Sequence, residues 1–243
     1  MIDTATVGWA AMDLAGADLG DARLNRRLVQ VAERLGAHPG ASIPVACGGW
    51  AETQGAYRLL AHEAVTCEQV LAPHWACSNE GMREHPVVLC VQDTTELDFT
   101  SQPGIAGLGP LSSLRQHGLY VHPTLAVTPE GIPLGVLDAW MWTRDPETLG
   151  KDKQHWPIEA KESIHWLEGF ERCAELGDNL PDTRLVYVAD RECDIHEFMV
   201  RAQHHSQVDW LIRAAHNQVI SSSTCQLLPP LAAAQPSASQ PAR

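Results

Sequence analysis

Two aspartates follow apolar runs of the chain in a pattern that suits metal chemistry. Asp93 comes directly after residues 87–92, and Asp190 comes directly after residues 185–189. Apolar, β-branched runs of this length are typical of buried strands, so both aspartates are expected at strand ends. A carboxylate there costs free energy unless it is paired or binds a cation. Two such carboxylates on neighbouring strands would form an oxygen site suited to Mg²⁺.

Each aspartate taken alone also has a simpler interpretation. Asp93 could cap a turn, helped by the hydroxyls of Thr94 and Thr95. Asp190 precedes a predicted helix, where Asp194 is the expected capping residue. The pair is the stronger signal, because the predicted topology places the two strands side by side.

Composition limits the class of protein. The chain has 243 residues, 44% of them hydrophobic, and a formal net charge of -13. No apolar run approaches the roughly 18 residues of a membrane span. Its seven cysteines lack any CxxC pair, which favours reduced thiols over zinc or disulfides. The negative charge argues against a general nucleic-acid coat but leaves room for a local basic face.

Such a face is predicted near the N-terminus. Leu24, Leu28, Val31 and Leu35 recur at helical spacing within residues 17–36. The arginines of this segment lie off that apolar stripe: Arg23, Arg26, Arg27 and Arg34. They could equally form an ordinary solvated helix face. Further helices are expected at 50–60 and 67–77, which gives a helical module over residues 1–85.

The pattern then changes to strands. Strands are predicted at 87–91, 120–127, 132–142, 185–189 and 208–213, with the second and third joined as an antiparallel hairpin by the turn at 129–131. Helices are predicted at 157–176 and 195–203, with Pro157 in the first turn. The order βββ-α-β-α-β indicates a mixed α/β fold over residues 86–217. Residues 218–243 are rich in Pro, Ser and Ala, and disorder is expected there.

Several segments together resemble the N-terminal part of IS4-family transposases, the group that includes the Tn5 transposase. The matching segments, in chain order, are LGDARLNRRL (19–28), GAYR (55–58), QDTT (92–95), KES (161–163) and DRECDIH (190–196). The resemblance implies a helical domain that recognises the transposon end, followed by an RNase H-like catalytic core. Transposon-end double-stranded DNA is the partner it implies, and the cytoplasm, at the bacterial nucleoid, is the location.

The resemblance also implies roles for individual residues. Asp93 and Asp190 match the first two acids of the DDE triad, which holds two Mg²⁺ ions, with Mn²⁺ as a substitute. In such sites the ions lie about 3.5–4 Å apart and assist phosphoryl transfer. Arg26 and Arg27 match basic residues of the DNA-reading module, next to Arg23. Tyr57 and Arg58 belong to the same module.

One part of the family pattern has no match. Family members carry the third acid, a Glu, in a Tyr-x2-Arg-x3-Glu-x6-Lys motif that this sequence lacks. The resemblance ends near residue 217, which predicts a truncated reading frame with weak metal binding and little cleavage. The alternative is a non-catalytic fragment that binds transposon ends and interferes with an intact transposase.

Overall fold

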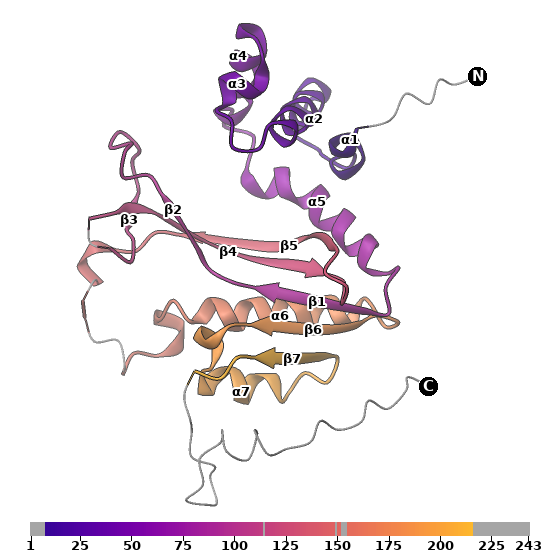
Figure 1. Ribbon diagram of the computed structural model, residues 1–243, viewed down its shortest axis with the longest axis vertical. Helices are drawn as coiled ribbons and strands as arrows, with labels where there is room; N and C mark the ends of the chain where they lie inside the picture. The colour runs from indigo at the N-terminus through magenta and orange to yellow at the C-terminus, as the bar shows by residue number, and fades with distance from the viewer. Residues whose placement is uncertain (1–7, 114, 149, 152–154, 216–243) are drawn as a thin grey trace, which may run out of the picture.

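The computed structural model describes residues 8–113, 115–148, 150–151 and 155–215. The tail 218–243, for which disorder is expected, lies outside these residues. Helices come first along the chain, and Figure 1 shows them stacked at one end of the molecule. Their bounds are α1 (Trp9–Asp13), α2 (Ala22–Ala37), α3 (Ile43–Cys47), α4 (Trp50–Leu60) and α5 (Cys67–Met82).

The N-terminal helices pack around the stripe that the sequence predicted. Leu28 and Val31 of α2 are buried, and Leu24 and Leu35 pack against the same cluster. Helix α2 begins later than expected because Asp21 caps it: the Asp21 carboxylate accepts a hydrogen bond from the backbone N–H of Arg23. The predicted helix 50–60 is confirmed as α4. Helices α1 and α3 were not predicted, because they are too short for apolar residues to recur at helical spacing.

A mixed sheet follows, as the sequence predicted. Its central order is β2-β4-β1-β6-β7, and β3 and β5 also pair with β4. Strands β1 and β4 are antiparallel, as are β4 and β5, whereas β1, β6 and β7 run parallel. The bounds are β1 (Val87–Gln92), β2 (Thr95–Asp98), β3 (Gly109–Pro110), β4 (His117–Val127), β5 (Pro133–Trp142), β6 (Arg184–Ala189) and β7 (Val208–Ile212). The short strands β2 and β3 were not predicted.

The sheet is interrupted at Asp93, between β1 and β2. Both strands pair with the same edge of β4, from Gln92 opposite Thr124 to Thr95 opposite Val121. The residues of β4 between those two pairs are His122 and Pro123. Proline has no backbone N–H to donate to a neighbouring strand, which favours a break in the ladder at this point. Asp93 therefore leaves the sheet where β1 ends.

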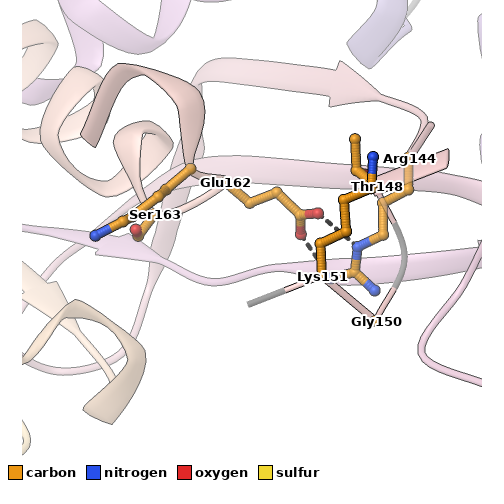
Figure 2. A pocket seen from close by; sticks show the side chains of 7 residues that line it. Arg144, Thr148, Gly150, Lys151, Glu162 and Ser163 are labelled. Atoms are coloured by element: carbon orange, nitrogen blue, oxygen red, sulfur yellow. Dashed lines mark hydrogen bonds and ion pairs between the residues drawn. The ribbon is translucent and has the colours of Figure 1, made fainter. Parts of the chain in front are cut away.

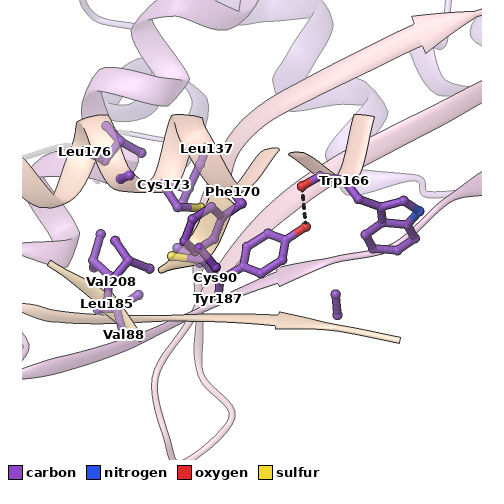
Figure 3. Close-up of a cluster of buried hydrophobic side chains, with 14 of the residues drawn as sticks. Val88, Cys90, Leu137, Trp166, Phe170, Cys173, Leu176, Leu185, Tyr187 and Val208 are labelled. Atoms are coloured by element: carbon purple, nitrogen blue, oxygen red, sulfur yellow. Dashed lines mark hydrogen bonds between the residues drawn. The ribbon is translucent and has the colours of Figure 1, made fainter. Parts of the chain in front are cut away.

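Helices α6 (Ile164–Asp178) and α7 (His196–Ala202) build the main core with β1 and β6. Figure 3 shows Phe170 of α6 over Cys90 and Tyr187, and the Tyr187 hydroxyl donates to the Trp166 carbonyl at 3.0 Å. Helix α6 approaches β1 so closely that a Cβ at Gly169 would overlap the buried Gln92 amide. The prediction that this helix begins at Pro157 is wrong. Residues 158–160 form a separate 3₁₀ turn, and Ser163 precedes α6.

Helix α5 joins the N-terminal helices to the sheet. The His74 ring accepts a hydrogen bond at Nε2 from the Val136 backbone N–H, at 2.9 Å, and donates from Nδ1 to Asp13 of α1, at 2.8 Å. One side chain thus connects α1, α5 and β5. That residues 1–85 form a domain of their own stays a prediction.

Candidate functional site

Asp93 and Asp190 lie next to each other at the ends of parallel strands. Strands β1 and β6 are in register up to Gln92 and Ala189, and each aspartate is the residue that follows. The carboxyl ends of adjacent parallel strands meet at one edge of a sheet, as the sequence analysis expected. Asp93 is exposed and Asp190 is half-buried. Both carboxylates can therefore meet a ligand from solvent.

Each of these carboxylates has one oxygen fixed by the backbone. Asp93 Oδ1 accepts from the N–H of Thr94 at 2.8 Å, and Asp190 Oδ1 accepts from the N–H of Glu192 at 2.7 Å. Neither forms an ion pair within the described part of the chain. Asp190 thus caps the 3₁₀ turn η3 (Arg191–Cys193) and not the helix α7 that follows it. Asp194 does not cap α7, and it accepts instead from the Ala215 N–H at 2.7 Å.

A third carboxylate, Glu192, lies beside this pair. Burial raises the pKa of Glu192, and the negative charges of Asp190 and Asp93 raise it further. Asp93 and Glu192 line a pocket of about 330 Å³, which we call the acidic pocket. Its other lining residues are Thr94, Glu96, Ser112, Tyr120, Trp142, Arg144, Glu162, Ser163 and Trp166. No group of three His, Cys, Asp or Glu residues suited to a metal ion occurs among the described residues.

Behind the acidic pocket, a buried histidine supports the turn that carries Asp93. His122 Nδ1 lies 2.7 Å from the Thr94 hydroxyl. This contact connects β4 to the segment between β1 and β2, where the sheet is interrupted. The His122 ring meets Trp166 edge-on at 4.5 Å and is fully buried. Burial lowers the pKa of His122 to about 4, with a smaller contribution from His165. The imidazole is therefore neutral at neutral pH.

An arginine and a glutamate in the lining of the acidic pocket form an ion pair. Arg144 binds Glu162 with two parallel bonds, Nε–Oε1 and Nη2–Oε2, both 2.6 Å long. The same guanidinium contacts the Tyr120 hydroxyl, and its carbon lies 4.2 Å from the ring centroid. The hydrogen bonds that Arg144 donates to Glu162 raise the pKa of Arg144. The bidentate bond fixes the orientation of the Arg144 guanidinium in the lining of the acidic pocket.

The N-terminal arginines separate into two groups. Arg27 forms an ion pair with Glu52 of α4 at 2.7 Å, and its guanidinium lies so close to Gly55 that a Cβ there would overlap it. Arg34 reaches the same glutamate at 3.6 Å. Arg26 is exposed and forms no ion pair with any described residue, whereas the exposed Arg23 pairs with Asp21 at 2.8 Å. The alternative of an ordinary solvated helix face therefore fits Arg23 and Arg26 but does not fit Arg27, which packs against α4.

Three of the five residues predicted to bind DNA share a groove between α2 and α4. Arg23, Arg27 and Arg58 line this groove of about 770 Å³ together with His62. Arg26 and Tyr57 lie outside its lining, and Tyr57 is 49% exposed on α4. Cationic side chains from two helices thus converge on one surface, which can receive the phosphates of a nucleic acid.

Residues 6–65 match the family described as transposase DNA-binding. This match covers α1 to α4, the arginines of α2, and the groove. It supports a transposase, and it makes DNA the partner of the N-terminal helices. In the described residues, no helix is both long and apolar enough to cross a membrane.

The structure also brings in residues that the sequence analysis did not select. Glu192 stands two positions after Asp190, so its charge alone was a usable signal. His122 and Arg144 gave no local signal, because each joins the site through contacts with distant segments, at Thr94 and Glu162. Residues 161–163 were matched only as a motif, and Glu162 and Ser163 line the acidic pocket.

Arg26→Ala and Arg27→Ala are expected to separate DNA contact from helix packing. Arg26→Ala should weaken DNA binding and leave the melting temperature unchanged, because its side chain is exposed. Arg27→Ala removes the bond to Glu52, and partly exposed pairs of this kind contribute up to about 1 kcal/mol, so the melting temperature should fall. Calorimetry and a DNA mobility shift on both variants check this. A larger loss of stability in Arg26→Ala would contradict the assignment.

Proposed function

We propose that this chain is a DDE-type transposase of the IS4 family, with an RNase H-like core that acts on the ends of its element. One observation carries the proposal: Asp93 and Asp190 follow adjacent parallel strands in a chain whose residues 6–65 match transposase DNA-binding domains. The mixed sheet, with α6 and α7 packed on β1 and β6, is consistent with that core. The proposed location is the cytoplasm, at the nucleoid.

The residues at the strand ends fit a divalent cation through their chemistry. Hard carboxylate oxygens are the ligands that Mg²⁺ and Mn²⁺ take, and neither aspartate has a cationic partner in the described part of the chain. Asp93 and Asp190 would hold the metal. Bound Mg²⁺ would activate the attacking oxygen and stabilise the leaving one in phosphoryl transfer. The chain itself orients the carboxylates, through the backbone bonds to one oxygen of each.

The arginines of the two sites would bind and position the DNA. The Arg144 fork presents positive charge where the phosphate would lie, which favours the charge that develops on phosphate oxygens. The groove between α2 and α4 would hold the transposon end, with Arg23 and Arg58 at its surface. Arg26 would contact phosphate beside it.

We also propose that the chain alone cleaves DNA poorly. The resemblance implies three carboxylates, and the sequence carries no match to the motif that holds the third. Two aspartates bind a cation more weakly than three carboxylates, because each ligand adds charge and an oxygen. A chain that binds ends without cutting them would compete with an intact transposase, which is the second candidate function.

A binding and cleavage experiment tests both candidates. A duplex with the element's terminal repeat should bind at least about tenfold more tightly than a mixed-sequence duplex, a difference of about 1.4 kcal/mol. Equal affinity for the two would contradict end recognition. With Mn²⁺, little nicking is expected from the chain alone. Robust nicking that Asp93→Ala abolishes would overturn the proposed weak cleavage and leave the transposase assignment intact.

A competition arm separates the two candidates. Added to an intact transposase of the same element, the chain should lower excision if it is an interfering binder. The variant Arg26→Ala should interfere less, because its end binding is weaker. Unchanged excision at saturating chain would exclude the interfering role.

A further inference from the structure

The lysines of this chain are confined to one short segment. Its 17 basic residues include only three lysines, Lys151, Lys153 and Lys161, in a chain with a net charge of -13. Lys153 lies outside the described residues. Lys151 and Lys161 line the same pocket, of about 390 Å³, which we call the lysine pocket. All the lysine charge of an acidic chain thus falls within one stretch of sequence, and both described lysines face one pocket.

Separate segments build the lysine pocket, as Figure 2 shows. Arg144 follows β5, Thr148 and Lys151 belong to the next loop, and Lys161 and Ser163 stand just before α6. Ser163 occupies the position before α6, but its hydroxyl does not cap the helix. The pocket therefore combines cationic groups with hydroxyl groups, the side chains that bind phosphate oxygens in proteins.

Among the residues that line the lysine pocket, cationic side chains outnumber carboxylates. Three of its lining residues are cationic, and the one carboxylate, Glu162, is bound by both arms of the Arg144 fork. Glu162 also holds Arg144 in place, because the side chains of the pair are only 30% and 24% exposed. An anion entering the pocket would meet the guanidinium that Glu162 holds in place, together with the side chains of Lys151 and Lys161.

The lysine pocket adjoins the acidic pocket. Arg144, Glu162 and Ser163 line both. These three residues therefore lie at the boundary between the two pockets. A strand whose reacting phosphate lies at Asp93 would place a neighbouring phosphate at the lysines.

We infer that the lysine pocket binds a backbone phosphate of the DNA strand that passes the Asp93–Asp190 edge. This inference rests on the proposed function and adds a second DNA-contacting surface, remote in sequence from residues 6–65. The same chemistry would accept a free phosphate ion, so the test includes that ligand. Arg144, Lys151 and Lys161 position the strand and take no part in bond making.

Amine-specific labelling measures the accessibility of the lysine pocket directly, because the chain has only three lysines. Acetylation of Lys151 and Lys161 is measured by mass spectrometry, with and without a mixed-sequence duplex at about ten times its dissociation constant. Such a duplex leaves about one site in eleven free, so acetylation should slow about tenfold. Binding of the duplex is followed in parallel by mobility shift, and inorganic phosphate alone is the comparison ligand.

Matched variants test the contribution of the charges. Lys151→Gln/Lys161→Gln should lower the slope of log affinity against log salt by about 0.9, the value for the one phosphate that the pocket contacts. Lys151→Arg/Lys161→Arg should keep the slope. Arg184→Gln is the charge control, because Arg184 begins β6 at the end of the strand away from Asp190.

The outcomes are distinguishable. Bound duplex with unchanged lysine acetylation, or equal slopes for the glutamine pair and Arg184→Gln, would overturn the inference and leave the proposed function standing. Equal protection by inorganic phosphate would overturn the assignment to a DNA strand. If neither this duplex nor the terminal-repeat duplex binds at all, the proposed function is overturned, and the inference with it.

Discussion

Asp93→Asn is expected to reduce the affinity for Mn²⁺ at least about tenfold, or about 1.4 kcal/mol. Asparagine has nearly the same volume as aspartate, but it loses the charge and one of the two oxygen ligands that a hard cation needs. The Asp93 side chain is exposed and forms no ion pair with a described residue, so the fold should tolerate the change. Titration of Mn²⁺ by calorimetry or electron paramagnetic resonance measures the loss.

A double-mutant cycle extends this experiment. If Asp93 and Asp190 share one ion, the effects of Asp93→Asn and Asp190→Asn should not add. Asp182→Asn is the matched control, because Asp182 is exposed in the turn before β6, at the opposite end of that strand. Native affinity in Asp93→Asn, or an equal loss in Asp182→Asn, would show that the strand-end aspartates do not hold the metal.

Acid is expected to destabilise the protein through His122, by up to about 3 kcal/mol. The pKa of this histidine falls from 6.5 to about 4 in the folded protein. Above pH 6.5 the ring is neutral in both folded and unfolded chains, and its contribution does not change. Between pH 6.5 and about 4 only the unfolded chain takes up the proton, so the free energy of unfolding decreases as the pH falls.

The His122 effect is measured by urea unfolding at a series of pH values on the native chain and on His122→Gln. Other groups titrate in both proteins, so the difference between the two curves isolates this ring. His165 is the titratable group that acts on His122, and its Nδ1 lies 2.7 Å from Glu168 Oε2 on α6. Parallel curves for the two proteins would show that His122 is not the group responsible.

The spacing of apolar residues along the sequence predicted the helices and strands that are long enough for that spacing to recur. It located α4 and placed β1, β4, β5, β6 and β7 within a few residues, because burial of one face gives a regular period along the chain. It missed β2 and β3, which are short and mostly lie in a polar loop, and it began α6 too early. Pro157 suits the first turn of a helix, but Ser163 is where the chain enters α6.

The candidate site likewise has features that the sequence predicts and features that appear only in the folded structure. The sequence by itself determined that Asp93 and Asp190 follow strands, and that arginines gather on α2. Only the tertiary structure decided that Arg27 turns inward to Glu52, that Glu192 and Arg144 join the acidic pocket, and that the lysines line a second pocket beside it. The physical reason is that period and composition report local burial, whereas ion pairs and pockets form between segments far apart in the chain, whose positions depend on packing of the whole fold.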